Sequence, residues 1–577
     1  MRPYRFSWKP RSRNMTPTER ERVSKVFASL VALVVLGVGY WRLYYGVDLT
    51  DESFYVAVPW RLVHGARPFV DEAAVAQQLA AVLLYPFVWA YGSLVGVSGV
   101  VLFLRHLQFL FSLAVLVAVV VGLRPVLATP RALLVGLAAV AFVPFQIHSL
   151  SYDTLGGGLF TAGCLLGFGS LREPQRRRLH LLAGVCHGLA VFVYPPLVAA
   201  VAVCYLIRLR LAHRRARRET LAIDLPALAL PLAGLAALVA GVGVDRFRSD
   251  YRQSRTTSLQ HWDAHKLVTV AAHEWHTLRF SYLLFPALAV AALLWTRRRE
   301  AARLVLLVLP FCMLPPKLGA VTASLEYVAH YGWLALPLLP LVRHRSGAGQ
   351  LFAACWLPAL VAGLATGYTS SNGGVNVGVG FFPAAIVSST FLIWALEPAS
   401  AGERRALVVA PVLVTLGFLL VFEAVPVYRD GPISTLDARV ESGAFAGLLT
   451  NSRKQAFLAR LHADVGALAP SCRILFFDDF PAGYLLTRAR ADTTSVWVHG
   501  RSREELLLRS YGRRRFPDVV VELRRIPYTE TTQRSERYRS TQPLLRMLRA
   551  HGYRLVVRRA DYLVYRRRSP ACRTRSR

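Results

Sequence analysis

The chain has few acidic residues, few cysteines and none of the short motifs that mark many soluble enzymes. Its 577 residues include 69 Lys and Arg against 34 Asp and Glu, which gives a net charge of +35. Only seven residues are cysteine, and no closely spaced cysteines or HExxH pattern indicate zinc. Residues 426–577 have no glycine-rich phosphate loop and no nucleophile–base arrangement. No zinc motif therefore supports a metal at the histidines of residues 261–276, and residues 426–577 show no catalytic centre of their own.

The excess of basic residues does not predict a nucleic-acid partner. The basic residues stand in short runs between apolar segments and in the C-terminal region, a distribution typical of membrane topology and lipid-surface electrostatics. Apolar stretches of about 17–25 residues recur from Val26 to Val425, each long enough to cross hydrocarbon as a helix. With 54% hydrophobic residues and a mean hydropathy of +0.38, the sequence predicts a polytopic helical membrane protein. The first apolar run lacks a small-residue cleavage site, so we expect it to remain as an anchor.

The positions of the basic runs predict the topology, because such runs mark the cytoplasmic side. Residues 1–25 are then a cytoplasmic N-terminus, and residues 26–425 form a multi-pass domain of the cell membrane. The stretch 180–209 is interpreted as a hairpin of two short spans, and Gln78–Val97 as embedded without crossing. The alternative makes 180–209 one span and 78–97 a full one. The preferred version has thirteen spans: 26–46, 100–121, 132–149, 155–170, 180–194, 196–209, 223–243, 280–296, 301–314, 325–342, 351–368, 378–396 and 406–425.

Residues 426–577 are predicted to form a soluble α/β domain outside the membrane, because helical periodicity alternates there with short apolar runs. Cys472 and Cys572 are the two cysteines of this region, and they could pair in an oxidising compartment. Their spacing alone leaves that pairing open. The predicted elements are helices at Ser442–Leu468 and Gln542–His551, and strands at Arg473–Phe477, Asp518–Leu523, Tyr553–Val557 and Tyr562–Tyr565.

An acidic motif follows the first span, in a predicted outer loop of residues 47–97. It reads Asp48-Leu-Thr-Asp51-Glu52-Ser-Phe-Tyr55. A carboxylate beside hydrocarbon is costly, so its presence points to proton transfer, metal binding or a polar substrate. Asp48 and Asp51 could equally cap the helix that follows, a common use of aspartate. The spacing of these residues alone favours neither interpretation over the other.

The next part of this loop strengthens the functional interpretation. Phe54–His64 is apolar on one side and can lie along the membrane surface as an amphipathic helix. Gly65-Ala-Arg-Pro-Phe-Val then turns the chain, and Asp71-Glu72 adds a second acidic pair. Asp-Glu-x-x-Tyr after the first span, a surface helix and Gly-x-x-Pro-Phe-Val-Asp together resemble the first outer loop of the GT-C glycosyltransferases. That class includes the protein O-mannosyltransferases, the aminoarabinose transferases of lipid A and the arabinofuranosyltransferases.

The resemblance is strongest over residues 26–100, weaker to about residue 345, and architectural beyond. It implies about thirteen spans and a soluble extracytoplasmic C-terminal domain. It also implies an inverting hexosyl- or pentosyltransferase that moves a sugar from a polyprenyl-phosphate donor to an envelope glycan, lipid or protein. Gln77-Gln78 stand where the aminoarabinose transferases carry a basic phosphate-contacting residue, so this chain departs from that group there.

The resemblance also implies roles for individual residues. Asp51 would be the general base that takes the acceptor hydroxyl's proton, and Glu52 would orient it or bind sugar hydroxyls. Asp153 matches the second acidic position, although it could instead cap the helix that begins at Thr154. A leaving phosphate needs positive charge, and Lys317 is our first candidate, with interfacial snorkelling as its alternative role. The further candidates for phosphate or substrate binding are Tyr55, Lys266, Arg279, Glu326 and His330.

The sequence also leaves metal binding, lipid-linked sugar transport and a non-catalytic binding role as alternatives. His261, His265, His273 and His276 stand at helical spacings, but a polar loop over the active site explains them better than a metal. The resemblance leaves a divalent ion at Asp51 and Asp153 open, and no other cofactor is predicted. A transporter or flippase of lipid-linked sugars would place ionisable residues near the bilayer midplane, whereas here the acids gather at one face and the spans carry few charges. A non-catalytic relative that binds envelope polymer is the remaining alternative.

Overall fold

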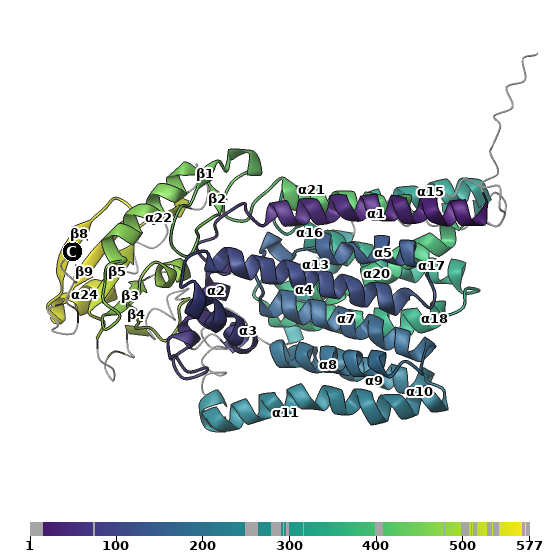
Figure 1. Ribbon diagram of the computed structural model, residues 1–577, viewed down its shortest axis with the longest axis horizontal. Helices are drawn as coiled ribbons and strands as arrows, with labels where there is room; N and C mark the ends of the chain where they lie inside the picture. The colour runs from purple at the N-terminus through teal and green to yellow at the C-terminus, as the bar shows by residue number, and fades with distance from the viewer. Residues whose placement is uncertain are drawn as a thin grey trace, which may run out of the picture.

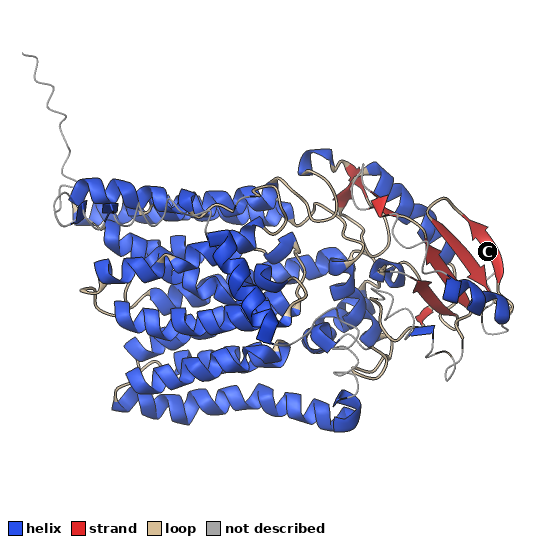
Figure 2. Ribbon diagram, turned by 180° about the vertical axis from the view of Figure 1, so that it is seen from behind, coloured by secondary structure: helices blue, strands red, loops and turns tan. Residues whose placement is uncertain are grey.

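The computed structural model describes most of the chain: residues 16–72, 75–248, 264–278, 290–291, 294–295, 299–315, 317–397, 408–477, 479–497, 507–508, 511, 516–527, 533–534, 542–567 and 572. A long bundle of helices fills one side of the molecule, and a region of mixed helices and strands lies at one end of it (Figures 1 and 2). The first helix, α1, runs along the edge of the bundle (Figure 1).

The helices of the bundle have the apolar composition of membrane spans, and the chain is a membrane protein. Within the described residues, six helical segments are long and apolar enough to cross a bilayer: 21–42, 100–123, 152–172, 214–242, 348–369 and 373–396. The bounds of the helices before residue 425 are α1 (Pro17–Arg42), α2 (Asp51–Val63), α3 (Val75–Leu94), α4 (Val100–Leu123), α5 (Thr129–Gly136), α6 (Ala138–Ala141), α7 (Tyr152–Arg172), α8 (Arg177–Val193), α9 (Val198–Leu211), α10 (Arg214–Glu219), α11 (Leu225–Val242), α13 (Ala264–Leu278), α15 (Arg299–Cys312), α16 (Ala323–Trp333), α17 (Ala335–Val342), α18 (Ala348–Leu351), α19 (Leu357–Thr369), α20 (Val377–Leu396) and α21 (Ala410–Ala424).

Burial separates the inner helices from the outer ones. The apolar 18-residue stretch of α20 is wholly buried within the protein, and the corresponding stretch of α7 is 94% buried. The corresponding stretch of α1 is only 17% buried, and that of the α10–α11 segment is 6% buried. Apolar side chains that the protein does not cover need lipid around them, so α7 and α20 form the centre of the bundle and α1 and α11 its lipid-facing edge.

One predicted span is wrong in its second half. Helix stops at Ala141 within the predicted span 132–149, and residues 142–149 form no α-helix. Pro144 has no backbone N–H to donate, and Phe145 and Gln146 have φ values of 57° and 59°, which a right-handed helix does not allow. The predicted span 280–296 lies almost entirely outside the described residues.

One of the two alternative segments has the predicted two-helix form, and the membrane placement of the other stays a prediction. Residues 180–209 form two helices, α8 and α9, separated by a short turn at Pro195–Leu197. Helix α3, which covers most of Gln78–Val97, lies with α2 at the end of the bundle that faces the C-terminal region (Figure 1). It is not among the six helices that are long and apolar enough to cross.

The C-terminal region is built on a five-stranded sheet in the order β4-β3-β5-β9-β8. Strand β3 is parallel to β4 and β5, whereas β9 is antiparallel to β5 and β8. Arg473–Phe477 is a strand over its predicted range, because four of its five residues are buried apolar side chains. The bounds are β1 (Ala438–Arg439), β2 (Leu449–Thr450), α22 (Ser452–Val465), β3 (Arg473–Phe477), β4 (Arg490–Ala491), β5 (Val519–Leu523), β6 (Ile526–Pro527), β7 (Gln533–Arg534), α24 (Gln542–Ala550), β8 (Arg554–Arg558) and β9 (Tyr562–Arg566).

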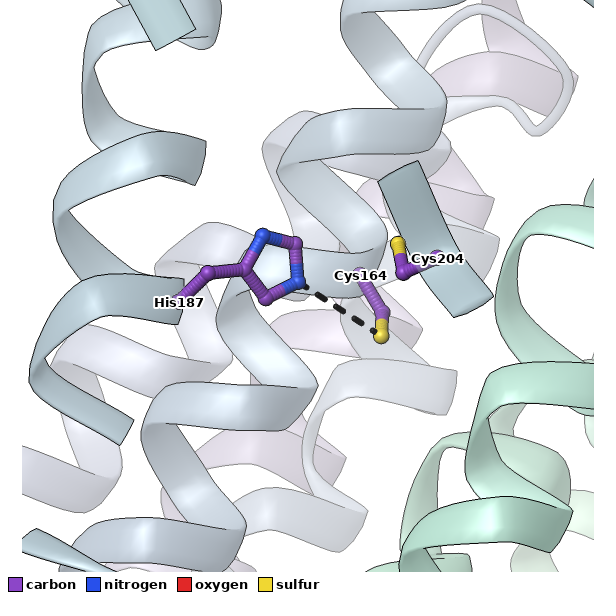
Figure 3. A group of neighbouring side chains, drawn as sticks. All are labelled: Cys164, His187 and Cys204. Atoms are coloured by element: carbon purple, nitrogen blue, oxygen red, sulfur yellow. Dashed lines mark hydrogen bonds between the residues drawn. The ribbon is translucent and has the colours of Figure 1, made fainter. Parts of the chain in front are cut away.

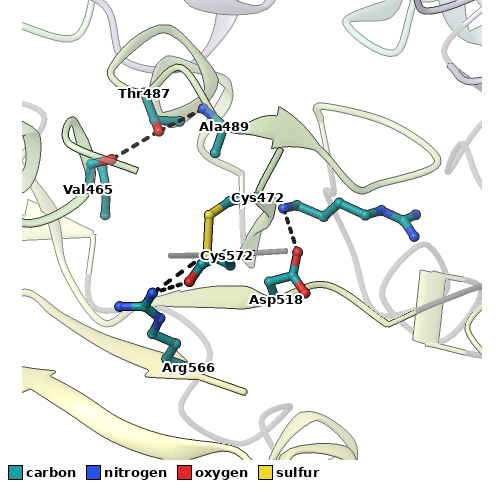
Figure 4. Close-up of a disulfide and its surroundings, with 8 residues drawn as sticks. Val465, Cys472, Thr487, Ala489, Asp518, Arg566 and Cys572 are labelled. Atoms are coloured by element: carbon teal, nitrogen blue, oxygen red, sulfur yellow. Dashed lines mark hydrogen bonds between the residues drawn. A yellow bond between two sulfur atoms is a disulfide. The ribbon is translucent and has the colours of Figure 1, made fainter. Parts of the chain in front are cut away.

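Two features of this region settle points of the sequence analysis. The helix predicted from Ser442 begins only at Ser452, because Gly443 and Gly447 have φ values of 77° and 89° and the side chain of Asn451 caps the helix. Cys472 and Cys572 form a disulfide that ties the start of β3 to the end of the chain (Figure 4). The pairing that the spacing left open is therefore present.

Candidate active site

Arg105 of α4 holds the loop that leads from α1 into the acidic motif. Its side chain is almost fully buried. Its Nε and Nη2 donate to the two carboxylate oxygens of Glu52 at 2.7 and 2.6 Å. Its Nη1 donates to the carbonyls of Leu43 and Tyr45, and Nη2 also donates to that of Gly46 at 2.8 Å. A buried guanidinium with all its donors used fixes the path of this loop.

Both carboxylate oxygens of Glu52 therefore accept hydrogen bonds from within the protein. Both its oxygens accept from Arg105, and Oε1 accepts a further hydrogen bond from the Ser149 hydroxyl at 3.0 Å. A carboxylate with these partners has little capacity left for a sugar. Of the two roles predicted for Glu52, the geometry favours orientation of its neighbours over sugar binding.

Asp48 caps helix α2, and Asp51 does not. Asp48 Oδ2 accepts from the backbone N–H of Glu52 at 2.7 Å, and Oδ1 accepts from the N–H of Thr50 at 3.0 Å. The Thr50 hydroxyl also donates to Oδ1, at 2.8 Å. These bonds satisfy donors that the first turn of a helix leaves without partners. Asp48 therefore accepts the N–H groups at the start of the helix, and the Asp51 carboxylate is available for another function.

The Asp51 carboxylate lies beside two residues of the segment that follows α21. The Tyr428 hydroxyl donates to Asp51 Oδ2, and Arg429 Nη1 lies 2.9 Å from the same oxygen. Within the described residues, Oδ1 accepts no hydrogen bond. Burial raises the pKa of Asp51 to about 7, Arg429 opposes this rise, and Asp48 adds to it. Asp51 can therefore exchange a proton near neutral pH.

The segment that carries Tyr428 and Arg429 is clamped between the first loop and helix α22. Asp430 accepts hydrogen bonds from the Val47 N–H at 2.8 Å, the Thr450 hydroxyl at 2.6 Å and the Asn451 amide at 2.6 Å. The buried Lys454 ammonium lies 3.2 Å from Asp430 and donates to the Val47 carbonyl at 2.7 Å. These contacts bring the two ends of the membrane domain together beside Asp51.

Lys454 also explains how Arg429 keeps an unusual backbone conformation. Arg429 has a φ of 51°, in the left-handed region that non-glycine residues seldom adopt. Its carbonyl accepts from Lys454 Nζ at 2.7 Å. Strained residues of this kind persist where surrounding contacts fix them, and they cluster at functional sites. The Arg429 guanidinium keeps 27% of its side-chain surface exposed, so it can reach a bound molecule.

Asp153 lies in the first turn of α7 without capping it. Ser151 is the cap: its hydroxyl accepts from the Thr154 N–H at 3.2 Å, and the Thr154 hydroxyl accepts from the Ser151 N–H at 2.7 Å. The alternative role proposed for Asp153 is therefore wrong. Asp153 is buried, and the amide of Asn376 lies 3.5 Å from its Oδ1.

Tyr55 lies between the two predicted acidic residues, Asp51 on α2 and Asp153 on α7. Its ring centroid lies 6.3 Å from that of Tyr152, which in turn lies 5.2 Å from that of Tyr194. Burial raises the pKa of Tyr55 well above its ordinary value, and the carboxylates of both Asp153 and Asp51 add to that rise. Because Tyr55 stands one turn after Asp51 on α2 and Tyr152 directly precedes Asp153, this ring contact brings the starts of α2 and α7 together.

The other predicted substrate-binding residues lie elsewhere. Lys317 is exposed in the turn after α15, and Glu326 of α16 accepts from the Thr322 hydroxyl at 2.9 Å. His330 is buried, with Nδ1 3.3 Å from the Met313 carbonyl. None of Lys317, Glu326 and His330 contacts Asp51, Asp153 or Tyr55 among the described residues. Lys266 donates to the Ser370 carbonyl at 2.9 Å.

The remaining predictions concern Arg279 and the histidines. Arg279 and His261 lie outside the described residues. His265, His273 and His276 are on α13, and in the described part of the chain they join no cluster of three metal ligands. Arg429 is the basic residue that the structure places against Asp51, and the sequence analysis missed it. The available signal was the polar run Tyr428-Arg429-Asp430 soon after the last apolar segment.

A large cavity of about 1310 Å³ lies between α2–α3 and the C-terminal region. Its lining includes Trp60 and Trp89 from the membrane domain, and Arg488 and Arg490 from the C-terminal region. Arg61 helps to join its two walls, since it donates to the Thr493 carbonyl at 2.6 Å. Asp51 stands nine residues before Trp60 on α2, or roughly 14 Å along the helix axis.

No protein-family model matches the chain, and no curated protein matches it in sequence. Among solved structures it is similar to ArnT from Cupriavidus metallidurans in the apo state, with a TM-score of 0.42 and 14% identity over 95% of this chain and 98% of that one. The same ArnT bound to undecaprenyl phosphate gives a TM-score of 0.40 and 14% identity, over 96% and 99% of the two chains.

A third similar structure is the archaeal oligosaccharyltransferase AglB from Archaeoglobus fulgidus, in complex with an inhibitory peptide and a dolichol-phosphate. It has a TM-score of 0.42 and 12% identity, over 88% of this chain and 69% of that one. ArnT and AglB are GT-C glycosyltransferases, the class whose first outer loop the sequence resembles. At these low TM-scores and identities, the function proposed next rests on the contacts around Asp51.

Proposed function

We propose that this protein is an inverting glycosyltransferase of the cell membrane, which moves a sugar from a polyprenyl-phosphate carrier to a hydroxyl group of an envelope acceptor. The observation that carries the proposal is the state of Asp51. Its carboxylate is buried, released from capping by Asp48, and has a pKa of about 7 beside Arg429. The donor class comes from the resemblance of residues 26–100 to the GT-C glycosyltransferases.

In the proposed reaction, Asp51 removes the proton of the acceptor hydroxyl as its oxygen attacks the anomeric carbon of the sugar. The bond from that carbon to the phosphate oxygen breaks, and the polyprenyl phosphate leaves with the electron pair. A general base whose pKa lies near the working pH contributes typically about 10²–10⁴-fold to such a step. Asp51 Oδ1 is the oxygen we assign to this role, because Oδ2 already accepts from Tyr428.

Arg429 is our first candidate for the contact to the leaving phosphate. Its guanidinium is partly exposed and lies 2.9 Å from Asp51, so a bound phosphate can replace the carboxylate as its partner. That exchange would remove a cation from Asp51 and make the carboxylate more basic when the donor arrives. Lys317, His330 and Arg279 remain further candidates for the phosphate.

The acceptor is proposed to lie in the large cavity between α2–α3 and the C-terminal region. Aromatic rings such as Trp60 and Trp89 offer flat faces to sugar rings, and Arg488 and Arg490 offer donors to anionic groups. We expect Arg488→Ala or Arg490→Ala to raise the acceptor KM and to leave kcat near the wild-type value. An unchanged acceptor KM in both variants would place the acceptor elsewhere.

The proposed topology puts residues 1–25 in the cytoplasm and residues 426–577 outside it. The Cys472–Cys572 disulfide supports this orientation, because such bonds persist in oxidising compartments. Basic runs between the spans support it as well. The active site then lies at the outer face of the membrane, where polyprenyl-linked sugars meet envelope acceptors.

The test is sugar transfer by membranes that contain the wild type, Asp51→Asn or Asp437→Asn, offered a panel of radiolabelled polyprenyl-phosphate sugars. Asp437 is the control: it is the same residue type, but it is exposed and does not line the cavity proposed for the acceptor. We expect transfer by the wild type and by Asp437→Asn, and loss in Asp51→Asn at equal expression. Full transfer by a folded Asp51→Asn would overturn the assignment, and movement of the donor across the membrane without transfer would identify a flippase.

A further inference from the structure

Three potential metal ligands converge inside the helical bundle, away from Asp51. They are Cys164 on α7, His187 on α8 and Cys204 on α9, and all three are buried. Their ligand atoms all lie within 4.8 Å of one another, and Cys164 Sγ is 3.9 Å from His187 Nε2 (Figure 3). Within the described residues, no other such group of three is found.

The packing around His187 keeps its ring beside Cys164. A Cβ atom at Gly163 would lie 2.7 Å from His187 Nε2, so the absence of a side chain there is what admits the imidazole. The ring is also held edge-on against Tyr205, with centroids 5.5 Å apart. The ligand geometry is thus built by α7, α8 and α9 together, and it does not depend on a flexible side chain.

A buried arginine stands next to this cluster. Arg208 fits against Gly167, one turn after Gly163 on α7, where a Cβ would lie 3.0 Å from its guanidinium carbon. Its Nη2 donates to the Ser170 hydroxyl at 3.0 Å and to Asp224. Its Nε and Nη1 have no hydrogen-bond partner among the described residues. The Arg208 guanidinium is paired with the buried Asp224 carboxylate, so it fixes α9 against Ser170 of α7 beside the cluster without adding an unpaired charge.

We propose that Cys164, His187 and Cys204 are the three protein ligands of one thiophilic d¹⁰ metal ion, either Zn²⁺ with a water as its fourth ligand or Cu⁺ with these three ligands alone. Two thiolates and an imidazole are ligands that both ions accept. An ion about 2.3 Å from each ligand needs them about 4 Å apart in a trigonal arrangement, and the Cys164–His187 pair already has this spacing. When Zn²⁺ enters, each thiol loses its proton as a metal–sulfur bond forms, so the buried charge is unchanged.

The proposed ion joins three neighbouring helices. Cys164 stands eleven residues after Asp153 on α7, which is roughly 16 Å along the helix axis, so the ion is remote from the transfer reaction. It would fix α7, the helix that carries Asp153, against the α8–α9 hairpin. The site therefore goes beyond the proposed function and does not rest on it.

The test measures metal in the purified full-length protein. Wild type is loaded with Zn²⁺ or with Cu⁺ under reducing conditions, freed of loosely held ions by a weak chelator, and analysed by elemental mass spectrometry. We expect about one ion per chain with at least one of the two metals, and at least a tenfold loss in Cys164→Ser and Cys204→Ser. Cys186→Ser is the matched control, because Cys186 precedes His187 on α8 and is outside the cluster.

A measurement on the wild type alone keeps the test independent of how the variants fold. X-ray absorption of the loaded protein should show two sulfur neighbours at about 2.3 Å from the ion. Retention of only one of the two metals would identify the ion. The proposal is overturned if the wild type retains neither metal, if the absorption shows no sulfur neighbours, or if Cys164→Ser and Cys204→Ser keep their ion.

Discussion

Replacing Arg429 with methionine should move the pH dependence of sugar transfer to higher pH. The change removes the cation that lies 2.9 Å from Asp51 and keeps an unbranched side chain of moderate length. The pKa of Asp51, about 7, is the result of burial that raises it and of Arg429 that lowers it. Without Arg429, burial and Asp48 still raise the pKa, and the hydrogen bond from Tyr428 still opposes them.

The size of the shift follows from the geometry. A neighbouring arginine lowers the pKa of an aspartate by about 1–3 units, and each unit corresponds to about 1.36 kcal/mol. Because the Arg429 side chain is 27% exposed, solvent weakens the pair, and we take about 2 units. The pKa of Asp51 then rises above about 7. A rise of this size lowers the ionised fraction of Asp51 at pH 7, and with it the rate of transfer, by roughly 50-fold.

The assay is the pH profile of kcat/KM for the wild type, Arg429→Met and Arg429→Lys. A general base works when deprotonated, so the rate rises as pH passes its pKa, near 7 in the wild type and at a higher pH in Arg429→Met. Arg429→Lys keeps the charge and should stay close to the wild type. Arg67→Met, at an exposed position of the same loop, is the control. An unshifted profile in a folded Arg429→Met would refute the coupling between Arg429 and Asp51.

Three further predictions follow from neighbouring contacts. Because the pKa of Asp51 in the folded protein lies above its ordinary value of 3.8, folding stability is lost as pH rises from about 4 to about 7. Asp51→Asn should remove this penalty, which is up to about 4 kcal/mol, and should therefore raise the melting temperature at pH 8 but not at pH 4. Arg105→Gln should destabilise the protein by about 3–5 kcal/mol, because it leaves Glu52 buried without its cation, and thermal unfolding checks this against the conservative Arg105→Lys. Cys472→Ser with Cys572→Ser should cost about 2–5 kcal/mol, and a reductant should lower the melting temperature of the wild type but not of this double variant.

Local sequence patterns predicted the elements whose structure depends on local composition. The strand at Arg473–Phe477 and the helix at Gln542–Ala550 lie where the apolar pattern placed them, since the strand is buried within the sheet and the helix packs Leu544 and Leu548 against one face of it. The contact between Tyr428 and Asp51 joins residues 377 positions apart, and no local pattern encodes it. Asp51 could be found from its place after the first span, whereas its partners could not.

Buried charges in the bundle were underestimated from the sequence. The spans were expected to carry few charges, yet Arg42 is buried at the end of α1, Arg105 near the start of α4, and Arg208 in α9. Their hydrogen bonds explain the difference, because Arg42 donates to the Glu423 and Tyr45 carbonyls much as Arg105 supports the same loop. An arginine within an apolar segment is itself a signal of such a partner.

Three carboxylates within five residues of the first loop differ in function because their partners differ. Asp48 accepts hydrogen bonds from backbone N–H groups, whose positions the chain fixes. Glu52 pairs with the Arg105 guanidinium, whose other N–H groups donate to backbone carbonyls. Asp51 instead faces a guanidinium that is partly exposed. In the proposed reaction, this guanidinium would exchange the carboxylate for the phosphate of the donor. Asp48 and Glu52 would then hold the loop in place, so that the basicity of Asp51 changes without movement of the backbone.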